Sequence, residues 1–438
     1  MPGDTRLIHV DQGFGRARQD AIYRAGIADH RPKIPTDFAE LERRARDAMS
    51  EKAWAYIAGG AGEGETMRAN RRALDRWAIV PRVLRDTSQR SLSIELFGQT
   101  LPAPLLVSPV GAGGLVKRDA DVEIGKAAAA LGLPYILSNQ GSAAMEDVAA
   151  AMDAVTLGAP RWFQLYWSVD DDLVDSFLRR AEAMGAAAVA VTLDTTMLGW
   201  RPQDLNLGSL PFARGEGIAQ YTRDERFRAI VDEKVRNPDP DAQQPKPSVG
   251  AIKTLVSIAR NAPGSWWRNL VDKHPRAAVE TFLSIYSRPS LSWSDIEGLR
   301  ERTSLPIVLK GVLHPDDARQ AVDLGVDGVL VSNHGGRQID GSIGSIDALV
   351  DVVDAVAGRT KVLVDSGIRT GADVFKALAL GADAACIGRP HMYGLAIDGE
   401  AGVRDVLANI AAELDLTVGL SGHTDVAALD RGALKKVD

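Results

Sequence analysis

Eight short runs of apolar, β-forming residues recur along the chain, and they constrain its fold more than any other feature. The runs lie at residues 104–109, 135–139, 162–167, 188–194, 306–311, 328–333, 361–367 and 384–389. They are continuously apolar rather than alternating, which is typical of strands buried on both faces of a parallel sheet. Segments with helical spacing separate most of them; in 171–185, apolar residues recur at three- and four-residue intervals.

Eight strand–helix units in series predict an α/β fold, a (β/α)8 TIM barrel. An open doubly wound sheet uses similar units, so the count favours the barrel without deciding it. We expect the barrel to occupy residues 101–425, with 205–290 inserted after strand four as a lid-like loop. A mobile surface excursion or a subunit contact explains the insertion equally well. Residues 1–100 are expected to form a helical segment packed on the barrel, and 426–438 a C-terminal tail.

The composition limits the classes of function. The 438 residues are 45% hydrophobic and 25% charged, the balance of an ordinary soluble protein. A net charge of −7 argues against nucleic-acid or acidic-membrane partners. One cysteine, Cys386, permits no internal disulfide, and no cysteines or histidines show metal-site spacing, so we expect no metal. The polar first residues and the lack of a long apolar run lead us to expect a cytoplasmic location.

Polar residues collect at the ends of the predicted strands, where barrel enzymes carry their active sites. They are Gln164, Tyr166, Thr192, Asp194, Arg201, Lys310, His334, Arg337, Asp365, Arg369 and Arg389. One base candidate, several cations and several hydroxyl groups on one rim predict a site for a small anion that loses a proton. His334 is the base candidate because glycines and an arginine flank it. Lys310 is expected to neutralise an anionic cofactor or to form a Schiff base. Arg369 and Arg389, with glycine turns, are expected to bind phosphate.

The motifs around these residues resemble a known family. SNHGGRQID (332–340), VDSGIRTGADVFKALALGAD (364–383) and IGRP (387–390) resemble the signature of the FMN-dependent α-hydroxy acid oxidases and dehydrogenases. The resemblance runs from about residue 40 to about 425, apart from the insertion. Within the family, AYIAGGAGEGETMRAN (55–70) and TLDTTMLGWRPQDLNLGSLPFARG (192–215) look most like its lactate 2-monooxygenase branch.

The resemblance implies a role for each residue of the rim. His334 takes a proton from the substrate and Asp194 stabilises the imidazolium, while Tyr166 hydrogen-bonds the substrate and Lys310 lies by the flavin. The implied carboxylate-binding residues are Tyr56, Arg201 and Arg337. The remaining implied FMN-binding residues are Pro109, Val110, Gly111, Ser138, Gln164, Thr192, Ser332, Asp365, Gly367, Arg369, Gly388 and Arg389.

The resemblance also implies oxidation of an L-2-hydroxy acid, with L-lactate as the first expectation. The products with O2 are the 2-keto acid and hydrogen peroxide or, in a monooxygenase, the decarboxylated acid, CO2 and water. The alternatives are a dehydrogenase using a quinone or carrier acceptor, an oxidase of a larger acid, a Schiff-base lyase and a non-catalytic barrel. Gln140 departs from the aromatic or aliphatic residue of better-known members, which leaves the substrate side chain open. Family members are commonly oligomers, so a homotetramer or octamer is expected.

Overall fold

Eight parallel strands close into a barrel, as the sequence predicts. The computed structural model of the chain describes residues 13–238 and 248–437. Around the barrel the strands follow the order β10–β11–β4–β5–β6–β7–β8–β9, so each strand pairs with its sequence neighbours and β11 closes the ring on β4. The bounds are β4 (Leu105–Val107), β5 (Tyr135–Ser138), β6 (Arg161–Tyr166), β7 (Val189–Thr192), β8 (Ile307–Val312), β9 (Gly328–Val331), β10 (Lys361–Val364) and β11 (Ala384–Ile387).

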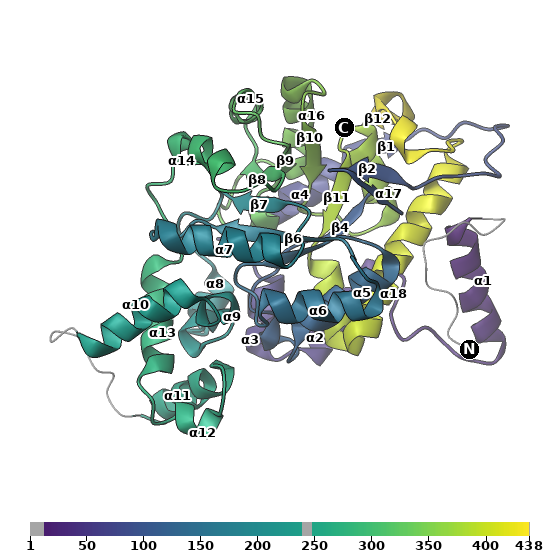
Figure 1. Cartoon of the computed structure of the whole chain (residues 1–438). Helices are drawn as coiled ribbons and strands as arrows, with labels where there is room; N and C mark the ends of the chain where they lie inside the picture. Colours follow the sequence, from purple (N-terminus) through teal and green to yellow (C-terminus); the bar gives the residue numbers. More distant parts are fainter. Residues whose placement is uncertain (1–12, 239–247, 438) are drawn as a thin grey trace.

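Helices cover the outside of this ring; all but the last return the chain from the end of one strand to the start of the next, and the last follows β11 (Figure 1). They are α5 (Ala120–Leu131), α6 (Met145–Val155), α7 (Asp171–Ala183), α14 (Trp293–Glu297), α15 (Pro315–Asp323), α16 (Ser345–Val356), α17 (Gly371–Ala379) and α18 (Arg389–Leu420). In the described part of the chain, no helix combines the length and the apolar character needed to cross a membrane.

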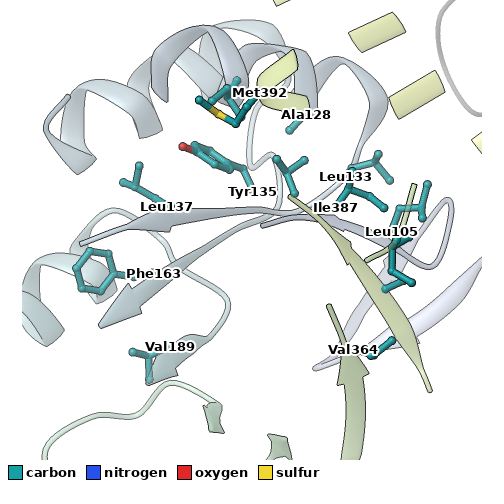
Figure 2. Close-up of a cluster of buried hydrophobic side chains, with 14 of the residues drawn as sticks. Leu105, Ala128, Leu133, Tyr135, Leu137, Phe163, Val189, Val364, Ile387 and Met392 are labelled. Carbon is teal, nitrogen blue, oxygen red and sulfur yellow. The ribbon is translucent and has the colours of Figure 1, made fainter. Parts of the chain in front are cut away.

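Strand side chains that point outward form the main core between ring and helices. Figure 2 shows Leu137, Phe163 and Val189 on the outer face of neighbouring strands, with Ala128 of α5 and Met392 of α18 packed above the sheet. Each of these side chains is almost completely buried. Side chains on the other face of each strand point into the barrel and are buried as well. Because both faces of a strand are buried, its residues form a continuous apolar run rather than an alternating one.

The barrel interior is built in two layers. The apolar layer contains Leu106, Ile136, Trp162, Ala190, Val308, Leu330, Leu363 and Cys386, one residue from each strand. Two residues further along each strand the same face carries Ser108, Ser138, Gln164, Thr192, Lys310, Ser332, Asp365 and Gly388. Because side chains on a strand alternate between faces, this second set also points inward. The interior thus turns from apolar to polar toward the C-terminal ends of the strands.

A hairpin covers the apolar end of the barrel. It consists of β2 (Ile94–Leu96) and β3 (Gln99–Leu101), and Leu96 and Leu101 pack into the apolar layer. Phe97 at its tip contacts Trp162, with ring centroids 5.3 Å apart. With this end covered, the polar C-terminal end is the one left for a ligand.

The two ends of the chain pack against the barrel. The N-terminal helices are α1 (Phe14–Ile27), α2 (Phe38–Ala48), α3 (Glu51–Ala58) and α4 (Glu65–Asp75). Helices α1 and α2 lie against α18. Strand β1 (Trp77–Ile79) pairs antiparallel with β12 (Leu434–Lys436), so part of the C-terminal tail forms a two-stranded sheet with the N-terminal region.

The insertion after β7 is largely helical, which corrects the expectation of a loop. It contains α8 (Pro202–Asn206), α9 (Ala219–Thr222), α10 (Glu225–Arg236), α11 (Val249–Asn261), α12 (Trp266–Asn269) and α13 (His274–Ile285); residues 239–247 lie outside the described part. Asp224 caps α10 and also accepts hydrogen bonds from Ser176 and Arg180 of α7. Phe227 and Val231, one helical turn apart, bury the inner face of α10. These caps and apolar pairs explain why a Pro- and Gly-rich segment forms helices.

Candidate active site

A cleft at the C-terminal end of the barrel collects most of the predicted site residues. It has about 1330 Å³ of empty space, including space open to solvent. The predicted residues that line it are Tyr56, Pro109, Val110, Gly111, Gln164, Tyr166, Arg201, Lys310, His334, Arg337, Asp365, Gly367, Arg369, Gly388 and Arg389. These residues belong to β6 and β8, to α3 and to the segments that follow β4, β7, β9, β10 and β11, so the cleft lies at the polar end of the barrel.

Four predicted residues lie one layer behind the cleft and orient groups that line it. Ser138 Oγ donates to Gln164 Oε1 at 2.9 Å, and Gln164 Nε2 donates to Thr192 Oγ1 at 2.8 Å. Ser332 Oγ accepts from Lys310 Nζ at 3.1 Å, and Asp194 contacts His334. These four residues are Ser138, Thr192, Ser332 and Asp194. They fix the side chains of their neighbours rather than form the surface of the cleft.

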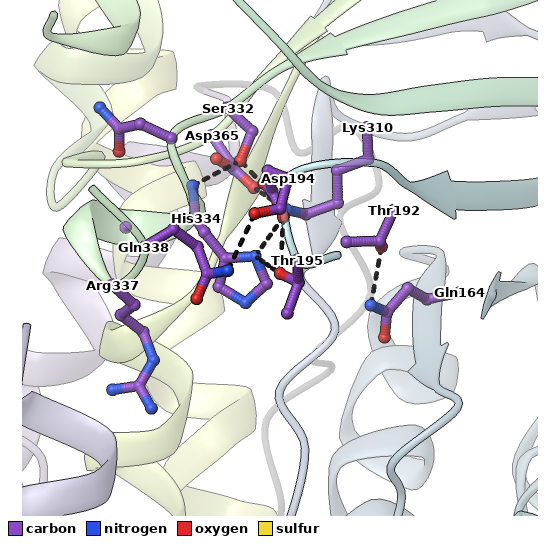
Figure 3. Close-up of polar contacts among 12 residues, drawn as sticks. Gln164, Thr192, Asp194, Thr195, Lys310, Ser332, His334, Arg337, Gln338 and Asp365 are labelled. Atoms are coloured by element: carbon purple, nitrogen blue, oxygen red, sulfur yellow. Dashed lines mark hydrogen bonds and ion pairs between the residues drawn. The ribbon is translucent and has the colours of Figure 1, made fainter. Parts of the chain in front are cut away.

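His334 and Asp194 form a hydrogen-bonded pair, with His334 Nδ1 2.8 Å from Asp194 Oδ1 (Figure 3). Thr195, which follows Asp194, donates to the same carboxylate oxygen at 2.8 Å. A carboxylate can only accept, so Nδ1 of His334 carries the ring proton. Nε2 is then the nitrogen with a free lone pair, and it has no hydrogen-bond partner among the described residues. The pair therefore presents a base to the cleft.

The charges around the pair hold it in the state that a base requires. Burial alone raises the pKa of Asp194, but the charge that His334 carries when protonated, the charge of Lys310 and the hydrogen bonds from His334 and Thr195 outweigh it, so the pKa lies well below its usual range. For His334, burial is the largest effect and lowers its pKa, while Asp194 opposes that change. His334 is thus neutral at neutral pH, beside a carboxylate that stabilises the ring once it takes a proton.

Lys310 is a buried cation held between two carboxylates. Its Nζ lies 3.3 Å from Asp194 Oδ2 and 3.8 Å from Asp365 Oδ2. Burial lowers the pKa of Lys310, but the two carboxylates prevail and raise it above its ordinary value. A Schiff-base lysine needs a neutral amine, so this environment argues against the lyase alternative. The same environment keeps Lys310 charged, so that it can stabilise negative charge that develops on a bound molecule.

Two arginines form a candidate anion site next to His334. Arg201 donates to the carbonyl of Arg337 at 3.1 Å and to Gln338 Oε1 at 2.8 Å. Arg337 donates to the carbonyls of Tyr56 and Gly59, and its guanidinium carbon lies 4.8 Å from the centre of the Tyr56 ring. Within the described residues neither arginine pairs with a carboxylate. Burial and the charge of Arg201 lower the pKa of Arg337, so an anionic ligand would relieve an unfavourable pair of like charges.

Arg389 and Arg369 continue this cationic lining. Arg389 donates to the carbonyls of Ile57, Gly335 and Gly59 at 2.8–3.0 Å. Arg369 lies over the Phe38 ring at 4.2 Å. No carboxylate among the described residues pairs with either arginine, and burial lowers the pKa of both. Both guanidinium groups are partly buried, and neither donates to a carboxylate among the described residues, so they can donate to an anion such as phosphate.

The His334 loop is shaped by backbone that few residues adopt. His334, Gly335 and Gly336 have φ values of 57°, 65° and 74°. Asn333 anchors the loop through a reciprocal amide pair with Asn70 of α4, at 2.9 and 2.6 Å. Ser366, with φ 74°, accepts from the Gly335 amide at 2.9 Å. Left-handed backbone at a non-glycine residue costs free energy, and here it directs the base into the cleft.

Part of the cleft lining comes from the insertion, and no pattern in the sequence predicts which residues of the insertion reach the cleft. Phe212 and Tyr286 line the cleft beside Tyr56. Gln220, completely buried, accepts from the Met145 amide at 2.9 Å and donates to the Ala143 carbonyl at 2.7 Å. The inner part of the insertion is therefore a wall bonded to the loop after β5. Thr195, Ser366 and Gln338 also belong to the site, and only their position next to predicted residues could have indicated them.

The sequence matches one protein family over most of its length. The model of the FMN-dependent dehydrogenase family matches residues 45–436. The chain belongs to this family. An FMN-dependent alpha-hydroxy acid dehydrogenase of Penicillium citrinum is 43% identical over 420 residues, 96% of this chain and 95% of that protein. An L-lactate oxidase of Lysinibacillus sphaericus is 40% identical over 405 residues, 92% and 94% of the two chains. A solved structure of mandelate oxidase with (S)-4-hydroxymandelic acid matches with a TM-score of 0.74 at 34% identity, covering 92% and 98%.

As a member of the FMN-dependent dehydrogenase family, the chain is an FMN enzyme that oxidises 2-hydroxy acids. The cleft fits this cofactor on three observations. Ser108 Oγ is buried in the cleft and has no hydrogen-bond partner among the described residues. A Cβ atom at Gly388 would meet nothing closer than 3.9 Å, so the backbone there is open to a ligand. Arg369 and Arg389 form no ion pair among the described residues, and the phosphate of FMN would provide the negative charge that they lack.

Proposed function

We propose that the protein is an O2-dependent oxidase of L-2-hydroxy acids, with L-lactate as its first substrate candidate. The observation that carries the proposal is the position of the His334–Asp194 pair next to Arg201 and Arg337. A base and two unpaired arginines in one cleft suit a substrate that has a carboxylate and, on the adjacent carbon, a hydroxyl group. The proposal includes a cytoplasmic location, expected from the polar first residues and the lack of a long apolar run, and a homo-oligomer, expected from the family resemblance.

The substrate's carboxylate binds Arg201 and Arg337 in this proposal. Each guanidinium can donate two parallel hydrogen bonds to a carboxylate, which fixes the position of the neighbouring carbon. Tyr56 and Tyr166 supply further donors, because burial raises the pKa of both phenols, that of Tyr166 to about 12. The substrate is then held by groups that keep their protons, with its hydroxyl group toward His334.

His334 takes one proton of the substrate at Nε2, and Asp194 stabilises the imidazolium through the Nδ1 hydrogen bond. Bound FMN supplies the two-electron acceptor for this oxidation. The residues proposed to hold it are Lys310 and Gln164 beside the ring and Arg369, Gly388 and Arg389 at the phosphate. Lys310 provides a fixed positive charge and remains protonated throughout, because Asp194 and Asp365 stabilise its ammonium group.

The fate of the product separates an oxidase from a monooxygenase. An oxidase releases the 2-keto acid and peroxide, whereas a monooxygenase retains them together and yields the decarboxylated acid, CO2 and water. The wall formed by Phe212 and Tyr286 is the part of the cleft that would control release. The polar side chain of Gln140 in the same cleft supports testing larger and more polar acids beside L-lactate.

The test measures O2 uptake by the FMN-loaded enzyme with L-lactate, D-lactate, glycolate and (S)-mandelate, and quantifies peroxide, keto acid and CO2. We expect uptake with an L-acid, one peroxide per keto acid for an oxidase, and CO2 with little peroxide for a monooxygenase. Reduction of a quinone without O2 uptake would instead establish the dehydrogenase alternative. Absence of turnover with every acid and acceptor would contradict the proposal.

A further inference from the structure

The hydroxyl group of Thr195 completes a triangle with the catalytic pair. Thr195 Oγ1 lies 2.8 Å from Asp194 Oδ1 and 3.2 Å from His334 Nδ1, and those two atoms are 2.8 Å apart (Figure 3). Thr195 is only 7% exposed, so little of its side chain is open to solvent. Two donors, the Thr195 hydroxyl and the His334 ring N–H, therefore share one carboxylate oxygen.

We propose that Thr195 is a positioning residue that sets the basicity of His334 by sharing Asp194 Oδ1 with it. A carboxylate oxygen that accepts two hydrogen bonds is a weaker acceptor for each of them. The hydroxyl group thereby limits how strongly Asp194 favours the protonated ring. The inference rests on the proposed function only in that His334 acts there as the base.

The contacts give the direction of the effect. Asp194 Oδ2 is occupied by Lys310 at 3.3 Å, so Oδ1 is the oxygen available to the ring. Without the Thr195 hydroxyl, Oδ1 would serve the His334 N–H alone and would hold the imidazolium more strongly. The ring would then take up its proton at a higher pH than in the wild-type enzyme.

The other groups near His334 do not change in such a variant. Asp194, Lys310 and Arg201 are the charged residues that act most strongly on His334. Further titratable groups in the lining of the same cleft include Tyr56, Tyr166, Arg337 and Asp365. None of them accepts a hydrogen bond from Thr195 except Asp194. A shift in the titration of His334 in a Thr195 variant is therefore assigned to the shared oxygen.

The test uses the FMN-loaded enzyme and the variants Thr195→Val, Thr195→Ala and Thr195→Ser. His334 is titrated by NMR with 13C-labelled histidine, and its signal is identified by its loss in His334→Gln. The acidic limb of kcat/KM against pH gives a second reading of the same group. Valine keeps the shape without the hydroxyl, alanine removes both, and serine keeps the hydroxyl without the methyl group.

We expect valine and alanine to raise the His334 midpoint by roughly half a unit to one unit, and serine to leave it within about 0.2 units of wild type. Wild-type midpoints in valine and alanine would overturn the proposal. A serine variant shifted as far as valine would also overturn it, since the methyl group and not the hydroxyl would then matter. The titration is read without substrate, so failure of every hydroxy acid to turn over would refute the proposed function and leave this test intact.

Discussion

Replacing Asp194 by asparagine tests the electrostatic account of the base most sharply. The substitution keeps the shape of the side chain and removes the charge that lies 2.8 Å from His334 Nδ1. Two unit charges at that distance interact by roughly 6 kcal/mol at an effective dielectric constant of about 20. Lys310 and Thr195 share the carboxylate, so we assign about half of this energy, roughly 3 kcal/mol, to the imidazolium. Since 1.36 kcal/mol changes a rate tenfold, kcat/KM should fall by about 10²-fold.

The loss of Asp194 also changes how the reaction depends on pH. Asp194 raises the pKa of His334, so its removal lowers that pKa further and moves the acidic limb of kcat/KM to lower pH. His334 stays neutral at pH 7 in both enzymes, and the loss therefore persists across the plateau. The assay is the rate at which the flavin band bleaches on anaerobic mixing with L-lactate, from pH 5 to 9.

Asp365→Asn is the matched control, because it removes a carboxylate near Lys310 that does not contact His334. Its acidic limb should coincide with that of wild type in the FMN-loaded enzyme. An Asp194→Asn enzyme that reacts within threefold of wild type, with an unmoved limb, would refute the reasoning.

Three further predictions concern cofactor binding and stability. Arg389→Met should weaken FMN binding by roughly 10²-fold in a fluorescence titration, whereas Arg431→Met, at the surface, should not change it. Ser366→Gly should be more stable than Ser366→Ala by about 1 kcal/mol in urea unfolding, because only glycine relieves the φ of 74°; equal stabilities would contradict the assigned strain. Gln220→Leu should lose about 1–3 kcal/mol of unfolding free energy, since one buried and one partly buried backbone group lose their partner, and a neutral result would show that the wall is not held there.

The barrel was predictable because its signal is local. Each strand is largely apolar, and each observed strand overlaps its predicted range, with ends that differ by no more than three residues. The positions of Gln164, Thr192 and Lys310 follow from the same runs, since a polar residue two positions beyond a buried one faces the same interior. Residues of this kind can be assigned to one rim from the amino-acid sequence alone.

The rest of the site depends on contacts between distant parts of the chain. Asn70 meets Asn333 across 263 residues, and Phe212 reaches Tyr56 only because the insertion folds back over the barrel. Hydrophobic periodicity in the sequence does not predict contacts between residues so far apart in the chain. The helices of the insertion did have local signals, such as the cap at Asp224, but proline and glycine around them favoured the interpretation as a loop.

The role of His334 is tested most directly by one comparison, the anaerobic reaction of wild type and His334→Ala with L-lactate, followed through the flavin absorption band. Both proteins are loaded with FMN, and their cofactor content is measured first. We expect the wild-type band to bleach with formation of one keto acid per FMN, and the variant to keep its FMN and react at least 10³-fold more slowly. A variant that retains FMN and bleaches at the wild-type rate would contradict the assignment of His334 as the base.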